Sequence, residues 1–381
     1  MKLLTWGVYL IVFCLPLYLV RFRIFGIPTT ILESMIYGLF IIWLINNLKN
    51  QLFSRSLKKL IFLNCFIGII LILIGVSLAT IFSSDLRTSA GIWKAWFVDP
   101  ILFFIVLISV IKNSKQVKKV LFSLFLSGTV VSIISLVYLI LGKLDPVGRL
   151  EAFYTSPNYL AMYLAPALVI GFGLITRKNI ISSTFILLSI ICLVLSIIFT
   201  YSFGAWLGIV AALGFGFFIY LLKLKKRLAW IILGFSLVFI LILGYLALIQ
   251  RGASLEARLI IWQRAFEVFK THPIFGIGPG TFGNYFPFYP EWGVPQPHNI
   301  FLAFLLQTGL LGFIGFIGVL TWFFRAGFKL LNINCYLLIV IMSIMVYILV
   351  HGLADTTYWK NDLSAVFWLV IGLMAALKKE P

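Results

Sequence analysis

The sequence predicts an all-α polytopic membrane protein, with about 12 transmembrane helices and one long extracytoplasmic loop that contains an amphipathic helix. Three observations predict this class. The chain of 381 residues is 62% hydrophobic and 11% charged, whereas soluble domains are about 25% charged. Apolar runs of roughly the 20 residues that cross a bilayer recur along the chain. Basic residues gather in alternate loops, as in membrane proteins with a fixed orientation.

Each apolar run is bounded by polar or turn-forming residues, which places the spans to within a few residues. The run after Lys2 has no small-residue cleavage site before Arg21, so we expect a retained span and not a signal peptide. No internal repeat is visible, and residues 1–381 are expected to form a single membrane domain. The predicted spans cover roughly residues 3–20, 27–46, 60–81, 91–111, 117–141, 157–175, 180–200, 203–222, 228–249, 298–324, 334–351 and 362–377.

The loops on the side of the N-terminus hold most of the 30 Lys and Arg residues, and Glu380 is the one acidic residue there. Cytoplasmic loops are rich in Lys and Arg, so both termini are expected in the cytoplasm. The net charge of +19 then reflects topology, and no nucleic-acid partner is expected. No metal and no cofactor is expected either, because the four cysteines form no metal motif; they are Cys14, Cys65, Cys192 and Cys335.

The long extracytoplasmic loop comprises residues 250–297. Its first half, SLEARLIIWQRAFEVFK, predicts an amphipathic helix that begins after an N-cap at Ser254. Arg258 falls on the edge of the apolar stripe, where an anionic lipid headgroup would arrive, and Arg264 points to the polar side. The alternative for Arg258 is a cation whose stem lies on apolar surface at the interface. The predicted stripe is Leu255, Leu259, Trp262, Phe266 and Phe269.

His298 opens the tenth span at the outer surface, directly after Pro295 and Pro297. The dipole of a helix N-terminus disfavours an imidazolium, so we expect a neutral ring that can take a proton from a hydroxyl. The alternative is a polar cap that hydrogen-bonds the end of its own helix. Further along this span, glycines recur every third residue and predict a close helix contact; they are Gly309, Gly312, Gly315 and Gly318.

Three charged residues fall inside predicted spans: Glu33, Lys94 and Asp99. Charges are costly in a bilayer, so we expect an ion pair that fixes helix packing, with a polar wall of an active cavity as the alternative. His351 and Asp355 lie at the outer end of the eleventh span. They could line the same cavity as His298 or form a local hydrogen-bonded pair.

Five stretches occur in a characteristic order: RLEAFYTSPNYLAMYL from Arg149, Arg258-x3-Trp262, HPIFGIGPGTFG, HNIFLAFLLQTGLLG, and HGLADTTYW from His351. Together they resemble the core signature of the O-antigen ligase and polymerase superfamily. The resemblance covers residues 149–359, and the first 140 residues match only as generic spans.

The resemblance implies a metal-independent membrane glycosyltransferase of the GT-C type in the bacterial inner (plasma) membrane. Its donor would be a glycan on a polyprenyl pyrophosphate such as undecaprenyl pyrophosphate, and its acceptor a hydroxyl of a lipid or a glycan on the extracytoplasmic face. The family's loop arginine corresponds to Arg258 and its loop-end histidine to His298, which are the predicted catalytic residues. The predicted substrate-binding residues are Arg149, Asn158, Arg264, His351 and Asp355.

This reaction releases pyrophosphate as an anion, which guanidinium groups could bind: Arg258 first and Arg149 second. His298 would accept the proton of the acceptor hydroxyl. One position departs from the family pattern, because Ser202-Phe203 stands where the family often has Ser-Arg. Candidates to replace the missing cation are Arg149, Arg87 and Arg251.

Two other functions remain possible from the sequence. A secondary transporter could use Glu33 and Asp99 as coupling residues, although the repeated halves typical of transporters are not visible. A non-catalytic partner in envelope polysaccharide assembly would tolerate Phe203. Within the enzyme hypothesis, no feature of the loop distinguishes a ligase from a polymerase.

Overall fold

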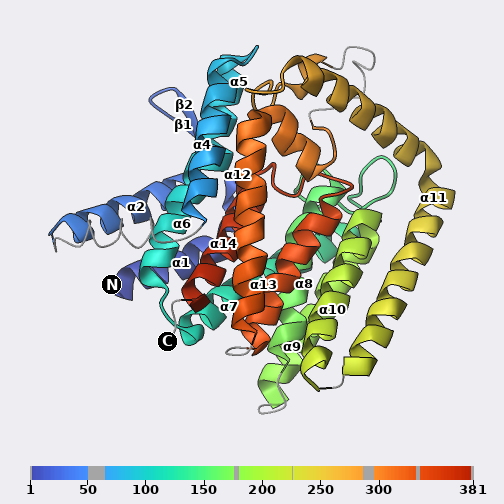
Figure 1. Ribbon diagram of the computed structural model, residues 1–381. Coiled ribbons are helices and arrows are strands. Elements are labelled where there is room, and N and C mark those ends of the chain that lie inside the picture. Colours follow the sequence, from blue (N-terminus) through green and yellow to red (C-terminus); the bar gives the residue numbers. More distant parts are fainter. Residues whose placement is uncertain are drawn as a thin grey trace.

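The computed structural model describes residues 2–49, 65–175, 180–224, 226–285, 296–331 and 335–378. The fold is nearly all-α (Figure 1). Its helices are α1 (Lys2–Phe13), α2 (Ile31–Lys49), α4 (Phe66–Ile81), α5 (Leu86–Ile92), α6 (Asp99–Val110), α7 (Ser114–Ile140), α8 (Pro157–Leu174), α9 (Ile180–Phe199), α10 (Phe203–Leu224), α11 (Lys226–Thr271), α12 (Ile300–Leu330), α13 (Cys335–His351) and α14 (Asn361–Lys378). Short helical segments are η1 (Leu15–Leu19), the π-helical η2 (Trp93–Val98) and η3 (Phe282–Tyr285).

Within the described residues, seven helices are long and apolar enough to cross a membrane. They are α2, the run Leu86–Val110 that joins α5 to α6, α7, α8, α10, α12 and α14. Shorter apolar helices lie at the other five predicted spans. The multi-pass membrane class is therefore confirmed, whereas the count of 12 spans stays a prediction.

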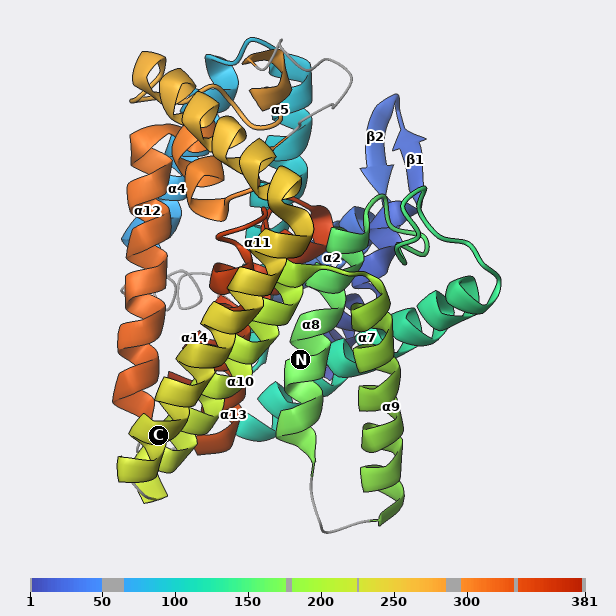
Figure 2. The same ribbon diagram turned by 90° about the vertical axis from the view of Figure 1, so that its right-hand side faces the viewer.

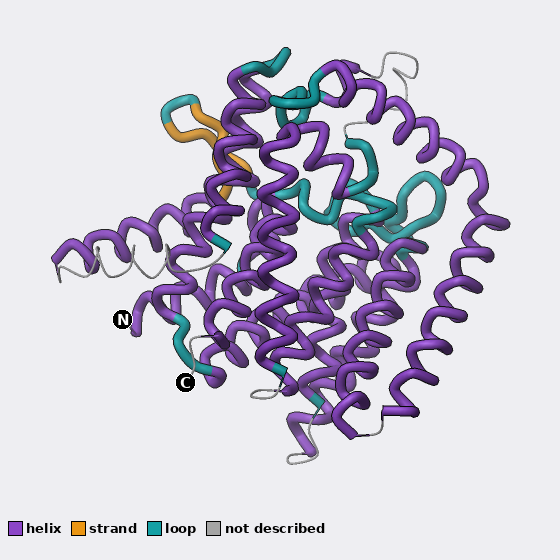
Figure 3. Tube along the Cα trace, in the orientation of Figure 1, coloured by secondary structure: helices purple, strands orange, loops and turns teal. Residues whose placement is uncertain are grey.

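A β-hairpin corrects the expectation of an all-α chain (Figure 3). Strand β1 (Arg21–Ile24) pairs antiparallel with β2 (Ile27–Thr30), with Arg21 opposite Thr30. The two turn residues, Phe25 and Gly26, both have positive φ angles of 49° and 80°. A two-residue hairpin turn of type I′ requires positive φ at both positions, and its backbone twist matches that of the flanking strands.

The predicted glycine contact is formed between α4 and α12. A methyl group on Gly315 of α12 would lie 2.6 Å from the carbonyl oxygen of Gly68 on α4, so the two backbones touch directly. At Gly309 (φ 66°) the helical path of α12 is interrupted, and Leu310 N donates to Pro273 O at 3.0 Å. The interruption opens a place for the loop that follows α11.

Helix α11 runs unbroken over 46 residues, from the predicted ninth span through the predicted loop helix. The predicted helix start at Ser254 is therefore wrong. Figure 1 shows α11 rising along one side of the bundle and then curving over its end, while α10 packs between α11 and α13 (Figures 1 and 2). A continuous helix forms because no proline and only one glycine, Gly252, separates the two predicted segments.

The buried face of the outer half of α11 also differs from the predicted stripe. Ile261, Ala265 and Val268 are buried against Phe282 and Leu306, with Trp262 and Phe269 partly buried beside them. Leu259 and Phe266 are instead 53% and 50% exposed. Because positions three and four apart share a helix face, Arg258 lies on the same face as Ile261 and Ala265 and points toward the bundle.

The predicted intramembrane ion pair is present. Lys94 Nζ lies 2.6 Å from Glu33 Oε2, where Glu33 stands in the first turn of α2. Asp99 begins α6 and is buried, but it forms no ion pair within the described part of the chain.

Candidate active site

The segment that carries His298 joins the described part of the outer loop to α12. Its helix is capped by Asn299, whose side-chain oxygen accepts hydrogen bonds from the N–H groups of Phe301 (2.9 Å) and Leu302 (3.1 Å). The alternative role of His298 as the helix cap is therefore wrong. His298 itself has a φ of 47°. A left-handed conformation is uncommon for a residue other than glycine, and such residues are frequent at functional sites.

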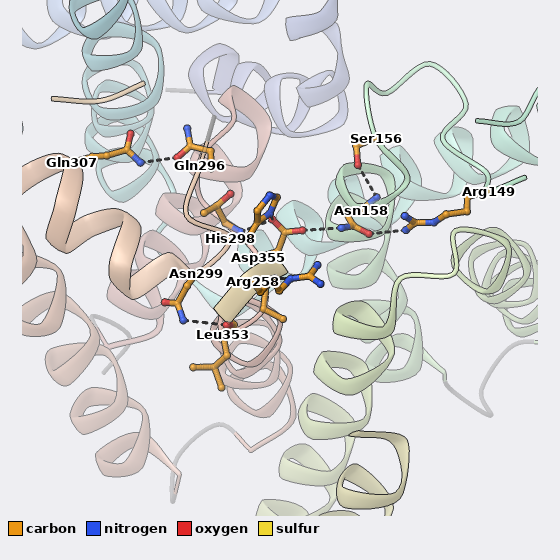
Figure 4. Close-up of polar contacts among 12 residues, drawn as sticks. Arg149, Ser156, Asn158, Arg258, Gln296, His298, Asn299, Gln307, Leu353 and Asp355 are labelled. Carbon is orange, nitrogen blue, oxygen red and sulfur yellow. Dashed lines mark hydrogen bonds and ion pairs between the residues drawn. The ribbon is translucent and has the colours of Figure 1, made fainter. Parts of the chain in front are cut away.

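Several hydrogen bonds hold this backbone in place. Ile300 N donates to Gly352 O at 2.7 Å, and Asn299 Nδ2 donates to Leu353 O at 3.1 Å. On the other side of His298, the buried Gln296 accepts a hydrogen bond from Gln307 Nε2 at 2.6 Å (Figure 4). The histidine is thereby fixed against the loop that joins α13 to α14.

Asp355 of that loop contacts His298 directly: His298 Nδ1 lies 3.0 Å from Asp355 Oδ1. The Asp355 side chain is 5% exposed and that of His298 is 32% exposed. Burial alone would raise the pKa of the Asp355 carboxyl, but the contact with His298 and the nearby Arg258 guanidinium hold that pKa well below its usual range. Asp355 is therefore a carboxylate at neutral pH.

An ionised carboxylate only accepts hydrogen bonds, so the proton of this contact belongs to Nδ1 of His298. In the neutral ring the other nitrogen, Nε2, then carries a lone pair. Because the histidine side chain is partly exposed, this nitrogen is the group that an arriving hydroxyl could meet.

A chain of hydrogen bonds continues from Asp355 to α8 and beyond (Figure 4). Asn158 Nδ2 donates to Asp355 Oδ2 at 2.9 Å, and Asn158 Oδ1 accepts from an Nη of Arg149 at 2.8 Å. Asn158 stands in the first turn of α8, which is capped by the side chain of Ser156. Arg149 Nε also donates to Thr200 O at 2.8 Å.

This last contact places the Arg149 guanidinium at the start of α10. Thr200 precedes Phe203 by three residues, and Phe203 stands where the family that the sequence resembles often has arginine. Three arginines are candidates to replace the cation that is absent at Phe203. Arg149 contacts the segment that precedes Phe203, whereas Arg87 lines a separate pocket. The side chain of Arg251 falls outside the described residues.

Arg258 reaches the same loop from α11. Its Nε donates to Ala354 O at 2.9 Å, which puts the guanidinium next to Asp355 (Figure 4). Four elements that are distant in sequence therefore bring together His298, Asp355, Asn158, Arg149 and Arg258.

Among the described side chains, neither His351 nor Arg264 is hydrogen-bonded to this group, but His351 is close enough to interact electrostatically with Asp355 and Arg258. His351 is 1% exposed, its Nδ1 contacts Tyr347 Oη at 2.7 Å, and its ring packs on Gly204 of α10. His351 and Asp355 are hydrogen-bonded locally through the backbone, because Asp355 N donates to His351 O at 3.1 Å. Arg264 donates to Tyr285 O at 3.1 Å and pairs with Glu267 at 3.0 Å.

Sequence reasoning missed the residues that support the histidine: Gln296, Asn299 and Gln307. Gln307 is a signal that could have been used, since it is one amide in a long apolar run. Its Oε1 accepts from Gly280 N (2.7 Å) and Trp359 Nε1 (3.0 Å), so one buried side chain joins the loop before α12 to the loop after α13. Among the described residues, no group of three or more His, Cys, Asp or Glu side chains could hold a metal ion.

Comparison with known proteins gives a match to one family model. Residues 187–317 match the family model described as O-antigen ligase. The match includes His298 and Arg258, while Arg149, Asn158 and Asp355 lie outside it. No curated protein matches the chain.

Proposed function

We propose, from the match of residues 187–317 to the O-antigen ligase family model and from the geometry of its polar cluster, that this chain is a membrane glycosyltransferase that moves a glycan from a polyprenyl-pyrophosphate carrier to a hydroxyl acceptor. The reaction takes place on the extracytoplasmic face of the bacterial inner membrane, and the acceptor is a lipid or a second glycan. Metal ions take no part in it.

His298 is the general base in this proposal. The acceptor oxygen forms a bond to the anomeric carbon as the bond from that carbon to the pyrophosphate oxygen breaks, and the electron pair leaves with the pyrophosphate. Nε2 of His298 takes the hydroxyl proton. Asp355 keeps Nδ1 protonated and stabilises the imidazolium that forms, a role that carboxylates have beside catalytic histidines.

The arginines bind the departing anion. Arg258 is the arginine nearer to Asp355, because its Nε donates a hydrogen bond to the carbonyl oxygen of the preceding residue, Ala354. Arg149 occupies the neighbourhood of Phe203 and supplies the cation that this position lacks. Guanidinium groups make paired hydrogen bonds to phosphate oxygens, so two of them can stabilise a pyrophosphate without a metal ion.

Asn158 and His351 are positioning residues in this proposal. Asn158 links the carboxylate to Arg149, so the base and the anion site are held in one geometry. His351 fills the space behind the loop, where it packs on α10.

The observation that carries the proposal is the 3.0 Å contact between His298 and Asp355 beside two arginines. The experiment is release of polyprenyl pyrophosphate from a lipid-linked glycan by the full chain in proteoliposomes. The variant His298→Asn suits the test, because asparagine tolerates the left-handed backbone of this position and cannot act as a base. We expect it to fold and to lose release, and imidazole to restore part of the activity of His298→Gly.

Lys270→Ala is the matched control. Lys270 is an exposed cation on α11, over the ring of Phe266 and outside the cluster. Release that survives in a folded His298→Asn protein would exclude His298 as the base.

A further inference from the structure

A pocket lined in part by charged side chains lies between the β-hairpin, α2, α5, η2 and the start of α14. It has a volume of about 440 Å³, which falls within the range of small-ligand sites. The residues that matter here are Arg21, Glu33, Arg87, Gly91, Lys94 and Asn361.

The single carboxylate of this set is already saturated. Glu33 Oε2 contacts Lys94 Nζ at 2.6 Å and accepts from Thr29 Oγ1 at 3.0 Å, and Glu33 Oε1 accepts from Asn361 Nδ2 at 3.0 Å. Lys94 also donates to Pro28 O at 3.3 Å. The charges of Lys94 and Glu33 therefore cancel within the wall of the pocket.

Two arginines remain. Arg21 comes from β1 and Arg87 from α5, and both side chains are exposed. In the described part of the chain neither has a carboxylate within ion-pair distance. The pocket thus presents two guanidinium groups from separate elements that form no ion pair in the described part of the chain, with Asp85 as the carboxylate that interacts electrostatically with Arg87.

We propose that this pocket binds a phosphate group, held between Arg21 and Arg87. Guanidinium pairs match phosphate geometry and keep their charge at every physiological pH. The proposal is independent of glycosyl transfer, since no residue of the pocket belongs to the cluster around His298.

The neighbouring surface favours a lipid headgroup over a free phosphate compound. Arg21 directly follows Val20, which lines an apolar pocket of about 470 Å³ with Leu17, Leu19 and Phe153. A phosphate site continuous in sequence with an apolar one suits a molecule that carries both a phosphate and acyl chains.

The test measures lipid binding to the full chain in detergent by native mass spectrometry. Phosphatidylglycerol is titrated against phosphatidylcholine, and inorganic pyrophosphate is added as a competitor. We expect selective binding of phosphatidylglycerol, weakened about 30-fold in the double variant Arg21→Gln/Arg87→Gln, since each basic residue contributes about 1 kcal/mol to anionic lipid binding.

Two further variants distinguish binding of the lipid in the pocket from its general attraction to positive charge on the surface. Arg23→Gln removes a charge from the same strand outside the pocket, and binding should not change. Gly91→Leu changes no charge, and a Cβ at this position meets nothing within 4 Å, so the new side chain enters open space at the pocket wall. It should weaken binding without unfolding the protein, which keeps the test valid if the double variant does not fold.

Competition by pyrophosphate would identify a phosphate site open to free anions, and its absence would identify a headgroup site. Two results would overturn the proposal. The first is an equal loss of phosphatidylglycerol binding in Arg23→Gln and in the double variant. The second is phosphatidylglycerol binding that neither Gly91→Leu nor the double variant changes.

Discussion

Nδ1 of His298 lies 3.0 Å from Oδ1 of Asp355, although 57 positions separate these residues in the sequence. The contact joins the loop before α12 to the loop after α13. Since Asp355 is buried and ionised, it sets which ring nitrogen of His298 carries the proton.

Replacing the carboxylate of Asp355 should therefore change which ring nitrogen of His298 carries the proton. In Asp355→Asn the side-chain amide can donate to Nδ1, which moves the ring proton to Nε2 and removes the base. We expect glycan transfer to fall about 10²- to 10⁴-fold with a small change in KM. Kinetics in proteoliposomes test this, with Thr356→Val as control, because the buried Thr356 hydroxyl has no hydrogen-bond partner among the described residues. Equal losses in both variants would point to damage of the loop.

The same carboxylate predicts a pH dependence of stability. The folded pKa of Asp355 lies below its ordinary value, so its contribution is fully present above the unfolded pKa of about 3.9 and is lost as the pH falls below it. The Tm of Asp355→Asn should lie below that of the native chain by a constant amount near neutrality. The difference should shrink below about pH 4. A difference that instead changed near neutral pH would contradict this origin.

Arg258 is expected to act through the several N–H donors of its planar guanidinium and not through its charge alone. Its Nε is engaged with Ala354 O, and a lysine cannot make that bond and reach a phosphate at once. Arg258→Ala should lower kcat/KM about 10²- to 10³-fold, and Arg258→Lys should recover little of it. Lys270→Ala, on the same helix, should leave the rate unchanged. Full activity in Arg258→Lys would show that charge alone is enough.

Variants of Asn158 and Ser156 distinguish a role in positioning the site from a role in capping α8. Ser156→Ala removes the N-cap of α8, which costs about 1 kcal/mol of stability, and it should keep activity. Asn158→Ala breaks the bridge between Asp355 and Arg149 and should lower kcat about tenfold, as loss of one positioned hydrogen-bond link does. Tm and kcat measured on both variants distinguish the two effects. The bridge would be irrelevant to turnover if both variants kept the native kcat.

The contact between α4 and α12 should be intolerant of one methyl group. In Gly315→Ala the new carbon would lie 2.6 Å from Gly68 O and 2.7 Å from Ile72 N, which are backbone atoms that cannot turn away. We expect a loss of about 1–3 kcal/mol in the free energy of unfolding. In Gly318→Ala the nearest atom is 3.8 Å away, so the higher helix propensity of alanine should leave stability equal or higher. Thermal unfolding in detergent measures both, and matching Tm values would refute the close contact.

Local patterns were enough to predict the multi-pass membrane class, the glycine contact and an ion pair of Lys94 inside the membrane, but not which carboxylate pairs with it. Each depends on residues whose spacing or burial cost is visible along the chain. The catalytic prediction for His298 and Arg258 came from the family resemblance, and the structure places them at one loop.

What the sequence could not supply are the long-range partners. The pairing of His298 with Asp355 depends on how two loops fold against each other through Asn299 and Gln307, and no periodicity encodes that. The β-hairpin was missed because four-residue strands beside an apolar run resemble the start of a span. The false break at Ser254 arose because a good N-cap residue can also lie within a helix when the chain on both sides favours helix.

The continuity of α11 has a mechanical consequence. Its 46 residues form one curved rod of roughly 70 Å measured along the backbone. A hydrogen-bonded helix bends little over short lengths, so a sideways push on the membrane half is transmitted to the half that carries Arg258. A bulky lipid that inserts beside α10 and α11 would thus move the guanidinium against the fixed carboxylate of Asp355. If the proposed donor is correct, passage of its lipid tail and the position of the cation would be coupled through a single helix.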